Sequence, residues 1–197
     1  MTLPVRRPYK AAGSTAIGAP LSTFALDRVT AQFPEAVAER YVDRTGGAWA
    51  VIHASWLPKV AAFLKTDPEL DFKLFESVDA VDRLHLAEND PRFEVVYFLY
   101  SISRNEHVRL KVRVSENHPE LPSVTPVYRG ANWWERFVWD FYGIRFVGHP
   151  DLRRILLYEE FQGHPLRKDY ALRDRQPLIP ERPIKDIFRG PGTSGVS

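Results

Sequence analysis

The stretch FEVVYFLYSISRNEHVRLKVRV, residues 93–114, decides the fold of this chain. Residues 93–102 are apolar at almost every position, as in a strand that is covered on both faces. In residues 107–114, basic side chains alternate strictly with Val and Leu, and this two-residue period is typical of a strand with one buried face. The turn-like residues 104–106 separate the two segments. The stretch therefore predicts two adjacent antiparallel strands.

Weaker patterns surround this hairpin. Residues 48–53 (AWAVIH) and 71–77 (DFKLFES) are predicted to form further strands. Ser55 is predicted to cap a helix with Pro58 in its first turn, and residues 22–44 have a mostly helical composition interrupted by a proline. These elements predict an α+β fold, with a small mixed or antiparallel sheet flanked by helices.

A short aromatic helix is predicted in residues 130–144, GANWWERFVWDFYGI. Asn132 is predicted as its N-cap, with Glu135 completing a capping box, and Gly143 is predicted to end it in a left-handed conformation. Arg136 and Asp140 are four residues apart and are expected to pair. The spacing predicts a buried stripe of Trp134, Phe137, Val138 and Phe141. The other aromatic residues lie largely outside this stripe, so this domain or another protein must cover the helix on a second side.

The chain is predicted to have three parts: an N-terminal arm (1–21), one α+β domain (22–170) and an extended C-terminal tail (171–197). The Pro- and Gly-rich composition of both ends favours arms without a core of their own. The longest apolar run has six residues, far fewer than the roughly 18 that a membrane-spanning helix needs. The first 20 residues lack the apolar stretch of a secretory signal.

Composition excludes several kinds of site. The chain of 197 residues has no cysteine, which excludes disulfides, thiolate zinc sites and cysteine-ligated iron–sulfur clusters. Its net charge is only +2, too small for a nucleic-acid-binding field over the whole protein. Residues 107–113 place four basic groups on one strand face, where an anion- or RNA-binding surface is possible, but a solvated sheet face is the favoured interpretation.

Two similar segments, GHPDLR at 148–153 and GHPLR at 163–167, are the strongest candidates for a functional site. His149 and His164, together with nearby aspartates, are candidates for metal ligands or an acid–base pair. Their spacing matches no compact ligand pattern, so the favoured interpretation is that these residues bind backbone groups and pair charges at turns or at an interface. No catalytic, cofactor-binding or metal-binding residue is therefore predicted.

These segments carry a family resemblance. ERFVWDFYGIRFVGHPDLRRIL at 135–156, followed by GHPLRKDY at 163–170, resembles the signature of the C subunit, or 30-kDa-type hydrophilic subunit, of proton-pumping NADH-quinone oxidoreductase, respiratory complex I. The likeness covers roughly residues 71–170. One departure is Phe137, where the family usually has an acid. The signature residues, also expected to include the partner contacts, are Glu135, Arg136, Asp140, Gly143, His149, Pro150, Asp151, Arg153, Arg154, Gly163, His164, Pro165, Arg167, Lys168 and Asp169.

The resemblance implies a non-catalytic subunit in the peripheral arm of the enzyme, scaffolding the quinone module during electron transfer from NADH to quinone. It implies no cofactor on this chain, with flavin and iron–sulfur clusters on other subunits. The D subunit would be the main contact in this hetero-oligomer, with the B and I subunits nearby and no nucleic acid bound. The chain would lie peripherally on the cytoplasmic side of the bacterial inner membrane, held there only through the complex.

Three alternatives remain open from the sequence. The chain could be the equivalent subunit of a related membrane-bound hydrogenase or ferredoxin-dependent complex. It could be an RNA-binding module that uses the basic strand face, or a metal-dependent hydrolase built on His149, Asp151 and His164. Within the favoured interpretation, four basic residues are predicted to dock against the D subunit: Arg153, Arg154, Arg167 and Lys168.

Overall fold

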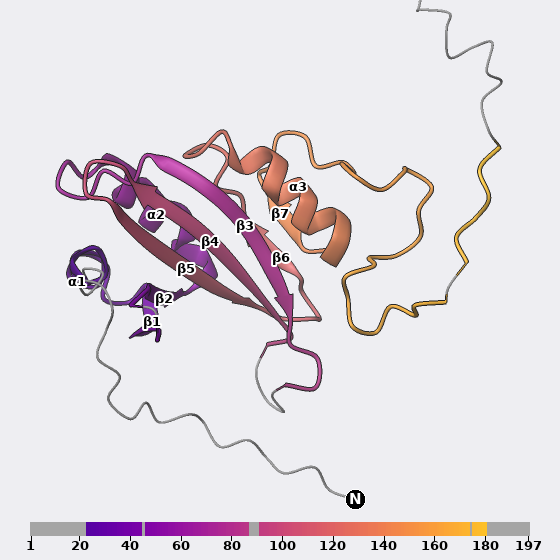
Figure 1. Ribbon diagram of the computed structural model, residues 1–197, viewed down its shortest axis with the longest axis horizontal. Helices are drawn as coiled ribbons and strands as arrows, with labels where there is room; N and C mark the ends of the chain where they lie inside the picture. The colour runs from indigo at the N-terminus through magenta and orange to yellow at the C-terminus, as the bar shows by residue number, and fades with distance from the viewer. Residues whose placement is uncertain (1–22, 45, 87–90, 174, 181–197) are drawn as a thin grey trace, which may run out of the picture.

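The structure, a computed structural model, describes residues 23–44, 46–86, 91–173 and 175–180 (Figure 1). The predicted N-terminal arm and most of the predicted C-terminal tail lie outside the described residues, and the predicted domain boundaries stay predictions. The elements, in chain order, are α1 (Phe24–Gln32), β1 (Val37–Val42), β2 (Ala48–Ile52), η1 (Ala54–Trp56), α2 (Leu57–Thr66), β3 (Leu74–Asp82), β4 (Phe93–Ser101), β5 (Glu106–Val114), β6 (Glu120–Pro122), α3 (Ala131–Tyr142) and β7 (Arg145–Val147).

The main sheet has five strands in the order β1-β2-β5-β4-β3. The predicted hairpin is confirmed: β4 and β5 pair antiparallel from Phe93 opposite Val114 to Ser101 opposite Glu106. β2 joins β5 in parallel, so the sheet is mixed, and a separate parallel pair is formed by β6 and β7. The predicted α+β class is therefore confirmed.

The core lies on one face of this sheet. Alternate side chains of β5 are buried there, as the two-residue period predicted. Strand β4 was predicted to be covered on both faces, but on its other face only Val96 is buried, whereas Glu94, Phe98 and Tyr100 are half-buried. Helix α2 packs behind this face in the view of Figure 1 and contributes Leu57, Val60 and Leu64 to the core. Helix α3 lies beside β3, its main neighbour in the sheet. The opposite sheet face carries the basic side chains of β5.

Upstream of the hairpin, two local predictions are wrong and a third has shifted bounds. Residues 22–44 are not mainly helical, because α1 ends at Gln32 and residues 37–42 pair with β2 as an edge strand. Pro34 cannot continue a helix, and the β-branched and aromatic residues after it suit a strand. The strand predicted at 71–77 runs instead from Leu74 to Asp82. Helix α2 follows a 3-10 turn and has no side-chain cap, so Ser55 is not its N-cap.

Helix α3 exists, but the residues it buries differ from the prediction. Its N-cap is Gly130, so the capping box of Asn132 and Glu135 does not form. The predicted stripe is only partly correct: Val138 is buried and Phe137 packs partly against the core, but Trp134 is 38% exposed and the helix also buries Ala131 and Glu135. The face with small and acidic residues packs against the fold, and much of the aromatic surface points outward. Gly143 ends the helix with φ 72°, as predicted.

Candidate functional site on helix α3

The signature residues lie on helix α3 and on the irregular segment that follows it. We call residues 148–170 the wrapping segment, because the chain passes around α3 there without regular secondary structure (Figure 1). Its two Gly-His-Pro motifs bind opposite ends of the helix. His149 Nε2 donates to the carbonyl of Asn132 at 3.2 Å, and its Nδ1 accepts the N–H of Asp151 at 3.0 Å. This pair of contacts requires the neutral imidazole, and burial lowers the pKa of His149 accordingly.

The second motif donates hydrogen bonds to carbonyl groups at the C-terminal end of the helix. The last four carbonyl groups of a helix have no partner within it, and here all four accept hydrogen bonds. Their donors, for the carbonyls of residues 139 to 142 in order, are Gly143 N at 2.9 Å, His164 Nδ1 at 2.9 Å, Leu166 N at 3.2 Å and Arg167 Nε at 2.6 Å. A side chain at Gly143 would lie 2.5 Å from His164 Nε2, so the close approach requires glycine as well as the positive φ.

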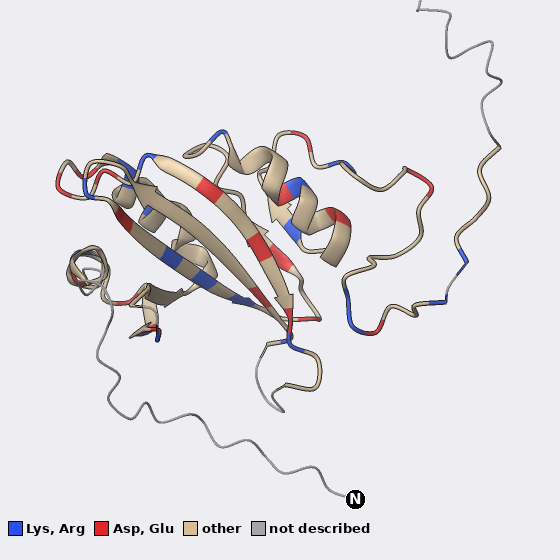
Figure 2. Cartoon of the chain, in the orientation of Figure 1, with Lys and Arg blue, Asp and Glu red and all other residues tan. Residues whose placement is uncertain are grey.

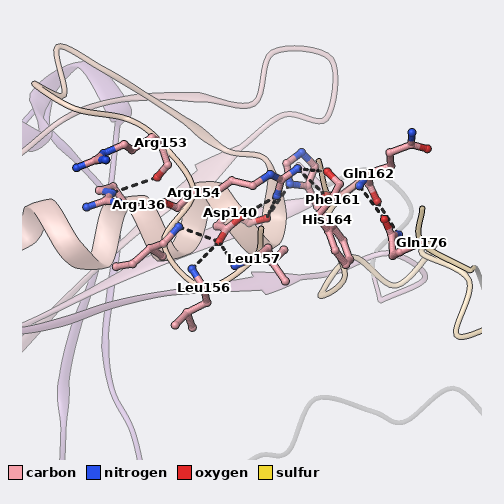
Figure 3. A network of polar contacts seen from close by, with 12 residues as sticks. Arg136, Asp140, Arg153, Arg154, Leu156, Leu157, Phe161, Gln162, His164 and Gln176 are labelled. Carbon is pink, nitrogen blue, oxygen red and sulfur yellow. Dashed lines mark hydrogen bonds and ion pairs between the residues drawn. The ribbon is translucent and has the colours of Figure 1, made fainter. Parts of the chain in front are cut away.

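Asp140 is the centre of the contact between α3 and the wrapping segment (Figure 3). Its carboxylate is fully buried and accepts four hydrogen bonds. Three come from successive backbone N–H groups at residues 155–157, at 3.0–3.1 Å, and one comes from Arg154 Nη1 at 2.7 Å. Burial alone would raise the pKa of Asp140, but these hydrogen bonds outweigh it and lower the pKa below its usual value. The site therefore holds a charged carboxylate whose hydrogen bonds all come from its own chain.

The guanidinium groups of the site also bind within the chain. The predicted pairing of Arg136 with Asp140 is wrong, because Arg136 donates instead to the carbonyls of residues 153 and 154, at 3.1 and 2.9 Å. Arg154, besides its bond to Asp140, donates to the carbonyl of Phe161 at 2.7 Å. Arg154 and Arg167 are thus engaged with α3 and the segment itself. Arg153 is largely exposed and pairs with Asp151, so it is the more accessible guanidinium.

A buried arginine that sequence reasoning missed fixes the far end of the wrapping segment. The Arg92 side chain is 5% exposed and binds three carboxylates. It pairs with Asp169 through two bonds of 2.6 and 2.8 Å, with Asp82 at 2.8 Å, and with Glu116 at 2.5 Å. Asp82 also accepts the N–H of Lys168 at 2.8 Å. Burial would raise the pKa of Asp82, but the bonds from Arg92 and the backbone bring it to about 2.

Glu135 fastens α3 to the loop after β6. It is fully buried, accepting Ser123 Oγ at 2.6 Å and the N–H of Val124 at 2.8 Å. No basic side chain pairs with it among the described residues. Burial therefore dominates and raises the pKa of Glu135 to about 7, against the lowering effect of the two hydrogen bonds.

We expect this carboxyl to make stability depend on pH. Because the folded pKa is about 7 and the unfolded value is 4.5, the folded protein keeps a proton that the unfolded chain releases. The contribution of Glu135 is thus fully present below pH 4.5 and is lost as the pH rises through about 7, a total of about 3 kcal/mol. Urea unfolding at several pH values between about 5 and 8 measures it. Glu135→Gln, which keeps an acceptor for Val124, should flatten this dependence; an unchanged slope would contradict the assignment.

The two histidines cannot share a metal ion. They bind carbonyls at residues 132 and 140, which lie about 12 Å apart along the axis of an α-helix. No group of three or more His, Asp or Glu suited to a metal ion occurs in the described part of the chain. Burial lowers the pKa of His164, whose Nδ1 donates to a helix carbonyl. The motifs thus hold a segment in place, the favoured interpretation of the sequence.

Apolar side chains remain exposed on α3, on β7 and on the wrapping segment. Trp133, 61% exposed, and Trp134 lie on the outer side of α3. Further exposed apolar residues lie in β7 and in the wrapping segment: Val147, Leu156, Tyr158 and Leu166. Large aromatic and aliphatic groups held on a rigid support are typical of the centre of a protein interface. We call these six residues the apolar surface.

Comparisons with known proteins agree with this description. Residues 50–176 match the family described as "Respiratory-chain NADH dehydrogenase, 30 Kd subunit". The C subunit of NADH-quinone oxidoreductase from Roseiflexus sp. (strain RS-1) is 43% identical over 147 residues, which cover 75% of this chain and 82% of that protein. The second C subunit of NADH-quinone oxidoreductase from Rhizobium etli (strain CIAT 652) is 53% identical over 111 residues, or 56% of this chain, and the match spans only 57% of that relative's length.

Solved structures share the fold. A trypsin-resistant fragment (1–134) of Nqo5 matches with a TM-score of 0.57 and 30% identity, over 65% of this chain and 99% of the fragment. A chain of the membrane-bound sulfane sulfur reductase, an archaeal respiratory membrane complex, matches with a TM-score of 0.61 over 75% of this chain and 84% of that one. Its 24% identity supports the fold alone. By the match over residues 50–176 and the identity to the Roseiflexus protein, the chain belongs to the family of the 30 Kd subunit of respiratory-chain NADH dehydrogenase.

Proposed function

We propose that the chain is a non-catalytic peripheral-arm subunit of a proton-translocating NADH-quinone oxidoreductase, where it scaffolds the quinone module. Electrons would pass from NADH to quinone through flavin and iron–sulfur clusters on other subunits. The observation that carries the proposal is that the signature residues hold the wrapping segment on α3, with an apolar surface left exposed beside it. This arrangement suits a binding surface better than a reaction centre.

The chemistry of the signature supports a structural role. Asp140, His149 and His164 bind backbone groups and Arg154 within the chain. A general acid or base needs a free position towards a substrate, whereas the Asp140 carboxylate is fully enclosed. The sequence also has no cysteine to ligate an iron–sulfur cluster. We therefore place catalysis on other subunits.

The proposed partners follow from the family resemblance. The D subunit would cover the apolar surface, with the B and I subunits nearby, on the cytoplasmic side of the bacterial inner membrane. None of the described helices is both long and apolar enough to cross a bilayer. Attachment to the membrane would then come through the complex. Arg153, which is exposed on the wrapping segment, would contribute a charged contact.

We expect Trp134→Ala to reduce assembly of the complex while leaving the fold intact. The side chain is 38% exposed on α3 and its ring packs edge-to-face on Phe137, so its loss should lower the free energy of unfolding by about 1–2 kcal/mol. Loss of an aromatic at the centre of an interface typically costs about 2 kcal/mol or more, a roughly 30-fold weaker association. Thermal unfolding of the full chain and recovery of assembled complex from gently solubilised membranes are the two measurements.

Ile102→Ala is the matched control, because Ile102 is also an exposed apolar residue but lies in the turn between β4 and β5. It should leave assembly unchanged. The NADH-to-quinone rate per assembled complex should be the same in both variants. If Trp134→Ala assembles normally, the apolar surface is not an interface. If His149→Ala assembles fully but abolishes turnover, the chain has a direct chemical role and the proposal fails.

A further inference from the structure

A row of oxygen atoms leads from the buried carboxyl group of Glu135 towards the surface of the protein. Glu135 Oε2 lies 2.6 Å from Ser123 Oγ, which lies 2.8 Å from Thr125 Oγ1. The exposed fraction rises in this order, from 0% for Glu135 to 6% for Ser123 and 9% for Thr125, and the next residue, Pro126, is exposed. We call Glu135, Ser123 and Thr125 the oxygen path, since they connect an enclosed acid to the edge of the protein interior.

The oxygen path satisfies Glu135 in both of its protonation states. When the carboxyl group is ionised, Ser123 donates to it and Thr125 donates to Ser123. When the carboxyl group is protonated, it donates to Ser123 and Ser123 donates to Thr125, because each hydroxyl group rotates to suit its neighbours. The N–H of Val124 donates to Glu135, and the N–H of Thr125 donates to Ser123 at 3.1 Å, in either state. A proton can therefore arrive or leave without movement of the heavy atoms.

The charged side chains of the elements around α3 are engaged with other groups. On β7, Arg145 pairs with Glu120, and on the wrapping segment Arg154 pairs with Asp140. β3, the main neighbour of α3 in the sheet, has no Lys or Arg, and its acidic residues, red in Figure 2, are Glu76, Asp79 and Asp82. No Lys, Arg or His side chain pairs with Glu135 in the residues that the structure describes. The ionised form of Glu135 therefore has hydrogen bonds but no compensating charge.

Tyr97 of β4 is the titratable group whose charge interacts with that of Glu135. Its hydroxyl is buried and makes no hydrogen bond within the described residues. Burial, and to a smaller extent the Glu135 carboxylate, raise the pKa of Tyr97, so this phenol stays neutral. Burial also raises the pKa of Glu135 to about 7, against the effect of its hydrogen bonds. Near neutral pH, the group that gains or loses charge here is thus Glu135.

We propose that Glu135 is a proton-binding site of the folded protein, loaded from water through the hydroxyl groups of Thr125 and Ser123. Thr125 Oγ1 takes a proton from a hydronium ion and passes its own to Ser123 Oγ, which passes its own to Glu135 Oε2. Each hydroxyl oxygen forms one O–H bond and loses one, so the net change is one proton moved from solvent to the carboxylate. Helix α3 stays in place throughout. The inference concerns the folded chain by itself and goes beyond the proposed function, on which it does not depend.

NMR titration of the full chain with isotope-labelled glutamate carboxyl groups tests the proton site. Glu135→Gln identifies the signal of Glu135 by removing it. That signal should titrate with a midpoint of about pH 7, whereas exposed glutamates titrate near about pH 4.3. Ser123→Ala removes a hydrogen bond to the ionised form, so the midpoint should rise by about one pH unit. A Glu135 signal that does not titrate between about pH 5 and pH 9 would overturn the proposal.

The rate of proton exchange at Glu135, measured from the width of its signal during the titration, tests the oxygen path. Thr125→Val keeps the size of the side chain but has no hydroxyl proton to pass on, so exchange should be roughly 100-fold slower. Thr125→Ser keeps the hydroxyl group and should exchange as fast as the unaltered chain. Equal rates in these two variants, whether fast or slow, would show that the proton does not travel through Thr125.

Hydrogen exchange of the Val124 amide separates the oxygen path from opening of the helix, because this amide donates to Glu135 and exchanges only when that contact opens. In the unaltered chain, the carboxyl proton should exchange much faster than the Val124 contact opens. If the two processes have the same rate, helix opening delivers the proton and the path is refuted. Amide NMR spectra check the fold of each variant, and this comparison decides the question even if Thr125→Val does not fold.

Discussion

Asp140→Ala is expected to lower the free energy of unfolding by about 3–5 kcal/mol and to release the wrapping segment from α3. The substitution removes a fully buried acceptor of four hydrogen bonds. It leaves Arg154 without its carboxylate and three consecutive backbone N–H groups without a partner, and each unsatisfied buried group is unfavourable. Urea unfolding measures the loss of stability, and limited proteolysis of residues 148–170 measures the release.

Asp151→Ala is the matched control for this change. Asp151 also pairs with an arginine of the wrapping segment, but both side chains are exposed, so its loss should change stability by less than about 1 kcal/mol. Combining Asp140→Ala with Arg154→Met should be less destabilising than the two single changes added together, since no guanidinium is then left unpaired. Additive losses, or a segment that stays resistant to protease in Asp140→Ala, would show that Asp140 does not anchor it.

Arg92→Met is expected to have an effect of similar size, about 3–5 kcal/mol, at the other end of the segment. Three carboxylates would lose their common partner, and Asp82 among them is almost fully buried. The folded pKa of Asp82, about 2, lies below its unfolded value of 3.8, so its contribution is present above pH 3.8 and is lost as the pH falls through about 2. Without Arg92 this loss should begin at a higher pH.

Acid unfolding monitored by fluorescence, together with hydrogen exchange at the amide of Lys168, tests this expectation. That amide donates to Asp82, so its exchange should accelerate in Arg92→Met while the amide of Asp151 stays protected at the His149 end. Arg145→Met is the control, because Arg145 forms an exposed pair with Glu120. If both variants unfold at the same pH, Arg92 does not fix the segment.

Local patterns in the sequence were sufficient to predict the β4–β5 hairpin and the C-terminal end of α3. The alternation in residues 107–114 predicted β5, because burial of one face imposes a two-residue period on any strand. Gly143 predicted the end of α3, because few other residues adopt a positive φ there. Residues 135–156 and 163–170 carried the family resemblance. The absence of cysteine excluded thiolate-bound cofactors.

Only the tertiary structure decided which side of α3 is buried. Apolar spacing favoured both Trp134 and Val138, but only Val138 is buried, together with Ala131 and Glu135. Glu135 can be buried because Ser123 and Val124 supply its hydrogen bonds, and those donors lie outside the helix. The apolar periodicity of a helix does not include hydrogen-bond donors on other elements. It therefore predicts that an acidic residue is exposed.

The polar network of Arg92 and Asp140 was beyond prediction for the same physical reason. Arg92 meets Asp169 across 77 positions, and Asp140 receives N–H groups from an irregular segment 15 to 17 positions away. The sequence by itself determined strands, turns and family, since these depend on neighbours within a few residues. Which charges meet, and which aromatic groups stay exposed for a partner, depends on the three-dimensional arrangement that brings distant segments together.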